Sequence, residues 1–352
     1  MSRPDVVVAG AGIIGSMIAW HLAKAGARAV LVDPAPRPAS AGTATWASAG
    51  GLRRQGRSAA DRPLARSAAE RWPGMAEALG ADIELRLGGH LHIAEREADL
   101  AALEARVAAD RDAGLDIRLV TGAELRGIAP AITPRAIAGA WTPGDGQAHP
   151  GRVAAATVDA FAALGGAVRF GAPVALAGSA AGVTGVVVDG ETIAAPLTIV
   201  AAGAWSADLV APAGLALPLR WRALTMLLSD RADADILAPT VTGIGRNLSL
   251  KQLRSGQFML GGAWLSRPTG RHRDAAPVDA HVAAQWSTGV AVLPALARHR
   301  LVQSWAGAEA QSPDGNPLVG RSRIPGLYLA TGCSNHGFQT APALGEAVAE
   351  DV

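Results

Sequence analysis

The 352-residue sequence contains a single cysteine, Cys333. One cysteine cannot form a disulfide within the chain, and it excludes zinc and iron–sulfur sites built from several cysteine ligands. A reducing, cytoplasmic setting is therefore expected. Lysine is almost missing as well, because Lys24 and Lys251 are the only lysines among 32 basic residues and the others are arginines.

The sequence also has no large excess of positive or negative charge. The 32 basic and 30 acidic residues nearly cancel, and the formal net charge is +2. The sequence has no block of about five or more like charges, the pattern typical of interaction tails. Since nucleic-acid binding usually needs a clustered basic face, we expect no nucleic-acid partner.

Long hydrophobic runs are missing too. The longest apolar run without a charge, residues 6–20, has 15 residues and contains three glycines. A helix that crosses a bilayer needs about 20 residues, so we expect no integral membrane segment. Hydrophobic residues still make up 49% of the chain and charged residues 18%, which excludes a disordered protein. At about 100–200 residues per domain, the length predicts two domains.

The N-terminal residues carry a pattern typical of dinucleotide binding. The apolar run Val6–Ala9 predicts a buried strand, and residues 16–25 have helical spacing. Between them, residues 10–15 read G-A-G-I-I-G. A second apolar run, residues 29–32, predicts another strand that leads directly into Asp33. Strand, glycine motif, helix, strand and acid together form the whole dinucleotide-binding unit, which is far more specific than the glycines alone.

Each part of this motif has a physical role. Gly10 permits a tight turn, Gly12 lets the backbone approach a pyrophosphate, and Gly15 lets the helix pack closely on the strand. The N–H groups at the start of the helix face the phosphates. Asp33 is expected to accept hydrogen bonds from the adenosine ribose, which disfavours NADP. The motif does not by itself separate FAD from NAD.

The remaining pattern predicts strand-rich segments between two ends of βα character. We expect a loop over residues 34–51 and a turn at 144–146. Helices are predicted over residues 60–79, 95–113, 150–164, 278–293 and from about 338. Strands are predicted over residues 83–87, 90–93, 117–120, 136–141, 168–170, 183–188, 192–193, 197–202, 220–228, 248–253, 257–260 and 326–330.

This order predicts an α/β fold, in which a mainly antiparallel substrate domain is inserted into a Rossmann-like nucleotide-binding domain. The nucleotide-binding domain is expected to be discontinuous, with residues 1–80, 145–215 and 300–352. The substrate-binding domain is expected to comprise residues 81–144 and 216–299.

Several motifs beyond the glycine pattern resemble those of one family. The chain resembles the FAD-dependent D-amino-acid oxidase superfamily, especially its branch of glycine oxidase, sarcosine oxidase β-subunit and hydroxyproline or opine dehydrogenase. The resemblance covers nearly the whole chain, in the order of the family's motifs. The motifs are residues 6–33, 45–51 (TWASAGG), 145–150 (DGQAHP), 199–206 (IVAAGAWS), 305–307 (WAG), 313–320 (PDGNPLVG), 326–332 (GLYLATG) and 336–339 (HGFQ).

The resemblance implies FAD as the cofactor. The strand after residue 306 has no cysteine at the place where monomeric sarcosine oxidases attach FAD, so we expect non-covalent binding. A helix N-terminus near residue 337 is expected to stabilise negative charge on reduced flavin. The residues expected to contact FAD are Gly10, Gly12, Ile13, Ile14, Gly15, Asp33, Thr45, Ala47, Gly50, Gly51, Val174, Ala202, Gly203, Trp205, Gly332, Gly337, Phe338 and Gln339.

The resemblance also implies the reaction, which is oxidation of an amino acid at its C–N bond. Hydride would pass from Cα to flavin N5, and water would hydrolyse the imine product. A secondary or cyclic amino acid, such as a hydroxyproline-, proline-, sarcosine- or opine-like compound, is the expected substrate. The alternatives are oxidation of a 2-hydroxy acid on the same fold and a flavin-binding subunit without catalysis of its own. As partners we expect other dehydrogenase subunits or further copies of this chain.

Two groups of residues are candidates for substrate binding. Glycine oxidases carry an arginine shortly after the W-A-G strand, but this chain has Glu309 there, closer to the hydroxyproline and opine dehydrogenase pattern. Glu309 is expected either to meet a substrate amine or hydroxyl or to pair with a nearby arginine. Arg53 and Arg54 are the best replacements for the missing arginine, since a guanidinium binds a carboxylate with two hydrogen bonds.

The remaining candidates are Lys251 and His336. Relatives use a lysine on a substrate-domain strand to activate oxygen, and the matching place here is Met259, with Lys251 on the strand before it. Lys251 is expected either to reach the substrate pocket or to be an ordinary exposed lysine. His336 opens the HGFQ motif, whose alternative role is that of a helix cap. His90 and His92 lie two residues apart on one face of a predicted strand, and we assign them no metal.

Overall fold

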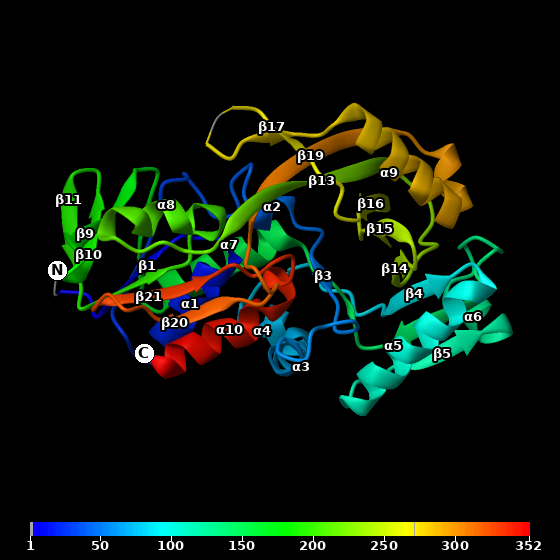
Figure 1. Ribbon diagram of the computed structural model, residues 1–352, viewed down its shortest axis with the longest axis horizontal. Coiled ribbons are helices and arrows are strands. Elements are labelled where there is room, and N and C mark those ends of the chain that lie inside the picture. The colour runs from blue at the N-terminus through cyan, green and yellow to red at the C-terminus, as the bar shows by residue number, and fades with distance from the viewer. Residues whose placement is uncertain (1–2, 271) are drawn as a thin grey trace.

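The computed structural model describes residues 3–270 and 272–352 and shows a mixed α/β fold with two large sheets (Figure 1). The first sheet has six strands in the order β20-β21-β12-β1-β2-β8. All its neighbouring pairs are parallel except β20 with β21. Its strands are β1 (Val6–Ala9), β2 (Ala29–Asp33), β8 (Ala167–Phe170), β12 (Leu197–Val200), β20 (Leu318–Arg321) and β21 (Leu327–Thr331).

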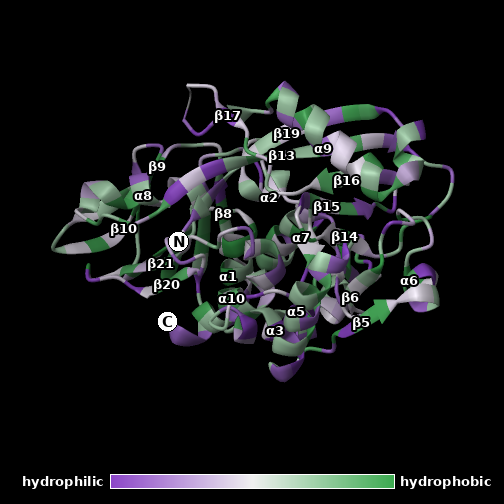
Figure 2. Cartoon of the chain, turned by 45° about the vertical axis from the view of Figure 1, so that its right-hand side comes forward, coloured by the Kyte–Doolittle hydropathy of each residue, from purple (hydrophilic) through white to green (hydrophobic). Residues whose placement is uncertain are grey.

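Helices from distant parts of the sequence pack together beside this sheet. Contacts join α1 to α7 and α10, and α10 to α3. Figure 2 shows α1 largely in the hydrophobic colour, which fits a helix with nine buried residues. The core here includes Met17 and Ile18 of α1 and Phe161 of α7. The helices are α1 (Ile13–Lys24), α3 (Arg62–Arg71), α7 (Pro150–Ala163) and α10 (Gly337–Asp351).

The second sheet has eight strands in the order β19-β13-β16-β15-β14-β4-β6-β5. All its neighbouring pairs are antiparallel except β14 with β4. The long strands β13 and β19 extend from this sheet toward the first one (Figure 1). Its strands are β4 (His90–Ala94), β5 (Arg118–Thr121), β6 (Ala138–Thr142), β13 (Arg220–Arg231), β14 (Thr240–Gly243), β15 (Arg246–Gln252), β16 (Gln257–Gly261) and β19 (Leu301–Gln311).

Smaller elements complete the chain. A three-stranded antiparallel sheet in the order β11-β10-β9 packs beside the first sheet, and α9 packs on the second. The remaining helices and strands lie outside the two large sheets and the helices named above. They are α2 (Ala44–Ala47), α4 (Met75–Ala78), α5 (Leu100–Asp112), α6 (Gly122–Ile128), α8 (Ser206–Val210), α9 (Asp279–Val292), β3 (Gly51–Leu52), β7 (Gly146–Gln147), β9 (Val174–Ser179), β10 (Gly182–Val188), β11 (Glu191–Ala194), β17 (Arg267–Pro268) and β18 (Ala275–Ala276).

The predicted fold class is confirmed, but two local predictions are wrong. Residues 83–87 form no strand and make only an isolated bridge from Arg86 to Gln147. The predicted loop over residues 34–51 contains α2, because the Thr43 side chain accepts a hydrogen bond from the Trp46 N–H at 3.3 Å and caps the helix. The sequence pattern also did not reveal β9 and β14.

The division into two domains stays a prediction. The C-terminal part of the proposed FAD-binding domain begins at residue 300, yet β19 pairs with β13 of the second sheet along most of its length. This pairing favours a boundary after residue 311 instead. Within the described residues, no helix has the length and apolar character needed to cross a membrane.

Candidate active site

A cavity of 1270 Å³ has walls from both large sheets. Its lining includes Gly10 after β1, Asp33 at the end of β2 and Ala202 after β12, and from the second sheet Thr242 of β14 and Glu309 of β19. The carboxyl ends of parallel strands are where open α/β sheets bind ligands. Pockets for one small ligand measure about 300–1,000 Å³, so this cavity has room for a dinucleotide and a substrate.

The glycine motif forms the wall of this cavity at the N-terminus of α1. Gly10 has a φ of +112°, and a Cβ there would lie 2.5 Å from the Ala201 carbonyl oxygen. A Cβ on Gly15 would lie 1.8 Å from the Gly10 oxygen. A Cβ on Gly12 would meet only the Thr45 hydroxyl, at 3.3 Å. Packing within the chain therefore requires Gly10 and Gly15, whereas Gly12 leaves the helix terminus open to the cavity.

Polar groups next to the glycine motif are partly engaged by the backbone. The Ile13 N–H donates to the Thr45 hydroxyl oxygen at 3.0 Å, which leaves the hydroxyl hydrogen available to a ligand. The Asp33 carboxylate accepts from the Ala11 N–H at 2.6 Å and from the Ala35 N–H at 2.8 Å. Burial raises the pKa of Asp33. Each carboxylate oxygen keeps a further lone pair for a ribose hydroxyl.

The N-terminus of α10 also lines the cavity, next to Ile14 of α1. The turn before it holds Ser334 at φ 46° and Asn335 at φ 72°, and α10 then begins at Gly337. A Cβ on Gly337 would lie 2.9 Å from the Cys333 Cβ, so the turn and the helix are closely packed. Burial raises the pKa of the Cys333 thiol to about 12, which keeps it protonated and unreactive. This helix terminus faces the cavity with Phe338 beside it.

Most residues expected to contact FAD line this cavity. Gly15, Gly50 and Gln339 do not line it. Gly15 packs beneath the turn, and a Cβ on Gly50 would lie 2.0 Å from the Ala148 oxygen. The Gln339 side chain donates instead to the Ala65 carbonyl oxygen. The lining residues are Gly10, Gly12, Ile13, Ile14, Asp33, Thr45, Ala47, Gly51, Val174, Ala202, Gly203, Trp205, Gly332, Gly337 and Phe338.

The donor set fits FAD. A bare helix N-terminus with a glycine at the N-cap suits a pyrophosphate, and a buried carboxylate suits a ribose. A second helix N-terminus, that of α10, lines the same cavity and suits an electron-rich ring. The individual contacts with the cofactor remain predictions.

The structure separates the two candidate arginines. Arg54 does not line the cavity, and its Nε donates to the buried Asp145 carboxylate at 2.6 Å. Arg53 does line the cavity, and the one hydrogen bond of its guanidinium among the described residues runs from Nη1 to the Gln55 carbonyl oxygen. Burial, reinforced by the charge of Arg106, lowers the pKa of Arg53. Arg53 is therefore the better candidate for an anion.

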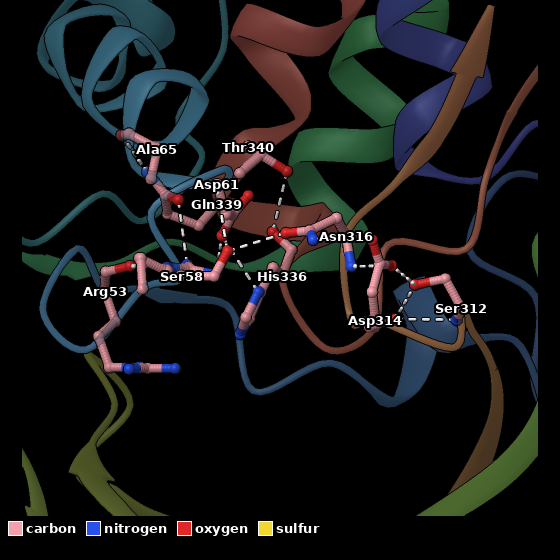
Figure 3. A network of polar contacts seen from close by, with 12 residues as sticks. Arg53, Ser58, Asp61, Ala65, Ser312, Asp314, Asn316, His336, Gln339 and Thr340 are labelled. Atoms are coloured by element: carbon pink, nitrogen blue, oxygen red, sulfur yellow. Dashed lines mark hydrogen bonds and ion pairs between the residues drawn. The ribbon is translucent and has the colours of Figure 1, made fainter.

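A buried polar network lies beside Arg53 (Figure 3). Arg57 donates to the Asp61 carboxylate and to the Gln339 side-chain oxygen, both at 3.1 Å. The His336 Nδ1 atom lies 3.2 Å from the same carboxylate. Burial lowers the pKa of His336, and Asp61 opposes this shift. Figure 3 shows the Arg53 side chain and the His336 ring extending away from this network in the same direction.

Sequence reasoning missed this network, although Arg57 and Asp61 stand four residues apart, the spacing of an ion pair on one helical turn. The missed pair orients His336, which sequence reasoning did select. Gln339, expected at the cofactor, instead joins the network and donates to the Ala65 carbonyl oxygen at 2.8 Å.

Glu309 also lines the cavity and pairs with Arg222 on the neighbouring strand β13. The Arg222 Nε atom lies 2.8 Å from the Glu309 carboxylate. Burial raises the pKa of Glu309, and the arginine opposes this shift. Of the two roles expected for Glu309, the structure provides the arginine partner directly.

Two histidines to which sequence reasoning assigned no function lie in the same wall. The Thr242 hydroxyl is 2.9 Å from His90 Nε2 and 2.7 Å from His92 Nδ1, so one hydroxyl joins the two rings. Burial lowers the pKa of His90 well below its ordinary value and that of His92 to about 3, and Arg53 and Arg106 add to both shifts. These histidines are therefore neutral at pH 7. In the sequence, only their positions two residues apart on one face of a predicted strand distinguished them.

Lys251 lines a second cavity, of 780 Å³, and does not line the first. Ser48 and Ala49 line both cavities, so the two adjoin at the segment after α2. Lys251 is buried, with 2% of its surface exposed, and it stands opposite Met259 on β16. Burial lowers its pKa to about 7. Its closeness to a cavity was not evident from the sequence.

The described residues contain no group of three or more histidine, cysteine, aspartate or glutamate side chains placed to bind a metal ion. His90 and His92 on β4 therefore have no third side chain of these types, among the described residues, that would complete a metal site with them.

Comparison with known proteins agrees with this geometry. The sequence profile of a family described as FAD-dependent oxidoreductase matches residues 5–351. The glycine oxidase of Geobacillus kaustophilus is 29% identical over 359 aligned residues, which cover 99% of this chain and 92% of that protein. An opine oxidase subunit from Agrobacterium tumefaciens is 26% identical, and the match covers 100% of this chain and 96% of that protein.

A solved structure shows the same similarity. The crystal structure of L-proline dehydrogenase from P. horikoshii matches with a TM-score of 0.90 at 25% identity. The match covers 99% of this chain and 92% of that one. The two chains therefore share one fold over nearly their whole lengths.

Proposed function

Because this chain belongs to the family of FAD-dependent oxidoreductases and uses FAD, we propose that it oxidises an amino acid at the C–N bond. A secondary or cyclic amino acid of the hydroxyproline, proline, sarcosine or opine type is the proposed substrate. Its relatives include a glycine oxidase, an opine oxidase subunit and a proline dehydrogenase. Each name implies oxidation of a compound at a carbon bonded to an amine nitrogen. The observation that carries the proposal is Arg53, a guanidinium in the wall of the cavity that forms no ion pair with a carboxylate of the described residues.

Bound FAD supplies a two-electron oxidant for the hydride of the substrate. The chain itself binds and orients the substrate. Arg53 would hold the substrate carboxylate, since a guanidinium and a carboxylate form two parallel hydrogen bonds. His336, held by Asp61 at 3.2 Å, would border the amine. Because burial lowers the pKa of His336, a neutral ring is favoured, which suits a reaction that consumes the neutral amine.

Glu309 would act as a positioning residue. Its carboxylate lies in the cavity wall, and the pairing with Arg222 at 2.8 Å fixes the direction of that carboxylate. A carboxylate near the substrate would favour the approach of an ammonium group and would then accept a hydrogen bond from the amine.

Lys251 is proposed to serve the later reaction with an electron acceptor. It lines the second cavity, which adjoins the first at Ser48 and Ala49. Replacing Lys251 by methionine should leave anaerobic reduction by the substrate nearly unchanged and slow reoxidation by oxygen. Equal slowing of both half-reactions would show that Lys251 is not specific to reoxidation.

A multi-subunit assembly is also proposed, because the opine oxidase subunit is similar over the whole chain. Copurification with the products of coexpressed neighbouring genes would test it, with light scattering of the purified chain as the reference. A chain that purifies alone and carries full activity would contradict a required partner.

Anaerobic titration of the purified holoprotein tests the proposed function. Proline, hydroxyproline, sarcosine, iminodiacetate and a set of 2-hydroxy acids are added, and the loss of the flavin absorption band is recorded. We expect bleaching by at least one of the amines. Bleaching by hydroxy acids alone would refute oxidation at the C–N bond. No bleaching by any compound would favour a flavin-binding subunit.

A further inference from the structure

We propose that the cavity contains a subsite for a second carboxylate, so that the substrate of this enzyme is a dianionic amino acid. The subsite is formed by Arg53 and Arg106, together with His90, His92 and Thr242, all of which line the cavity. This inference rests on the proposed function for the first carboxylate and narrows its substrate class.

The charges of the cavity wall leave two cations without a partner. Four arginines line it, and two of them are neutralised: Arg57 by Asp61 and Arg246 by Glu95. Among the described residues, neither Arg53 nor Arg106 lies within 4.0 Å of a carboxylate oxygen. Asp61, Asp110 and Asp145 also act on Arg53 without lining the cavity, but each of them pairs with another arginine. The surplus in this wall is therefore two guanidinium groups.

The acids of the same wall cannot neutralise these two groups, because each is engaged elsewhere. Asp33 lies at the end of β2 and accepts two backbone N–H groups. Asp208 pairs with Arg273, and Glu309 pairs with Arg222. These three are the only acidic residues among the described residues that line the cavity.

The two unpartnered arginines are close enough to disfavour each other's charge. The Arg106 charge contributes to the lowered pKa of Arg53, and both arginines contribute to the lowered pKa values of His90 and His92. Arg106 reaches the wall from α5, where its guanidinium lies beside Gly56 in the segment that follows Arg53. Two like charges in a partly dry cavity repel each other strongly, and a bound anion would remove this cost.

The histidine pair supplies a second, independent feature. His90 is 1% exposed, and its Nδ1 atom is buried without a hydrogen-bond partner among the described residues. Its Nε2 atom and the His92 Nδ1 atom both meet the Thr242 hydroxyl. A neutral imidazole can donate one hydrogen bond. His90 Nδ1 is closed off even from water, so a ligand in the cavity would instead meet His92 Nε2, which has no hydrogen bond among the described residues.

These features specify an anion larger than one carboxylate. A single substrate carboxylate engages one guanidinium with two parallel hydrogen bonds and leaves the other guanidinium unpaired. A substrate with two carboxylates would neutralise both. The second carboxylate could stand on the substituent of the nitrogen, as in an N-carboxyalkyl amino acid, or on the side chain. Both kinds of substrate carry the same two negative charges, and the substrate assays described below distinguish them.

The test measures binding of two inert sulfur analogues to the holoprotein. In 2,2′-thiodiacetate and (methylthio)acetate a sulfur replaces the amine nitrogen, so neither carries a C–N bond, and they differ by one carboxylate. Binding is followed by the shift of the flavin absorption band. We expect 2,2′-thiodiacetate to bind at least about tenfold more tightly, since a hydrogen-bonded charge pair typically supplies that factor.

Variants locate the effect. R106Q should abolish the preference for the dianion, so that the two compounds bind this variant with affinities within about twofold of each other. R111Q, the same substitution at an exposed position of the same helix, should retain the preference. Retention of the preference in R106Q would overturn the proposal. Equal affinities of the two compounds for the wild-type protein would overturn it without any variant.

Substrate tests distinguish the two dianions and separate this inference from the proposed function. Iminodiacetate is compared with sarcosine for a second carboxylate on nitrogen, and N-methylaspartate with N-methylalanine for one on the side chain. Preference for either dianion, measured as kcat/KM for flavin reduction, supports the subsite. If both amines of each pair reduce the flavin equally well, the subsite is refuted and the proposed function stands. If the dianionic analogue binds preferentially but no amine reduces the flavin, the proposed function fails and the anion subsite stands.

Discussion

Replacement of Lys251 by methionine should stabilise the protein, by an amount that depends on pH. The side chain is 2% exposed on β15, and no ion pair among the described residues includes it. Burial lowers the pKa of Lys251 from 10.5 to about 7, because the charged amine is unfavourable away from water. Methionine has a similar length and carries no charge, so it removes this cost.

The magnitude follows from proton linkage. Above pH 10.5 the lysine is neutral in both the folded and the unfolded chain, and it contributes no pH dependence. Between pH 10.5 and about 7 only the unfolded chain binds the proton, so stability falls as the pH falls. Below about pH 7 both states are protonated and the cost is constant. The pKa difference corresponds to about 4 kcal/mol at pH 7 and about 2 kcal/mol at pH 9, at about 1.4 kcal/mol per pH unit.

Urea unfolding of the holoprotein at a fixed excess of FAD measures this effect. K251M should raise the free energy of unfolding by several kcal/mol at pH 7 and by clearly less at pH 9. The control is K24M, which replaces the only other lysine, an exposed side chain over the Trp20 ring. Its effect should stay within about 1 kcal/mol at both pH values. A gain from K251M that is the same at pH 7 and pH 9 would refute the reasoning.

Three further changes probe the cofactor site and the core. G12V should lower the flavin content of the purified protein, measured by absorbance, because a Cβ there already lies 3.3 Å from the Thr45 hydroxyl; full flavin content would contradict the assigned cradle. F161A should cost about 3–5 kcal/mol in urea unfolding, since Phe161 is fully buried. R57M should cost about 3–5 kcal/mol because it leaves the buried Asp61 carboxylate unpaired, and a loss below about 1 kcal/mol would show that Asp61 takes up a proton instead.

Much of the cofactor site could be predicted from sequence, because its signals are local. Gly10, Gly12 and Gly15 stand at fixed spacing after one strand, and Asp33 ends the next. The turn, the helix start and the strand end that these residues form depend on neighbours within about 30 positions. The structure places Gly10, Gly12 and Asp33 in one cavity wall and Gly15 beneath the turn.

The substrate side could be predicted only as a list of candidates. Arg53 and Arg54 are adjacent and chemically identical in sequence, but Asp145, distant in the chain, neutralises Arg54 alone. Lys251 was selected by analogy, yet its burial depends on how the strands β15 and β16 pack against the segment after α2.

The sequence by itself determined the dinucleotide unit and the fold class, since strand and helix periodicity and the glycine spacing are properties of short segments. Tertiary structure decided which charges are paired. Thr242 joins His90 to His92 from a strand about 150 residues away, and Arg106 reaches Arg53 from a separate helix. The electrostatic state of a side chain depends on the distance to charges and on exclusion of water, and both are set only when remote segments pack together.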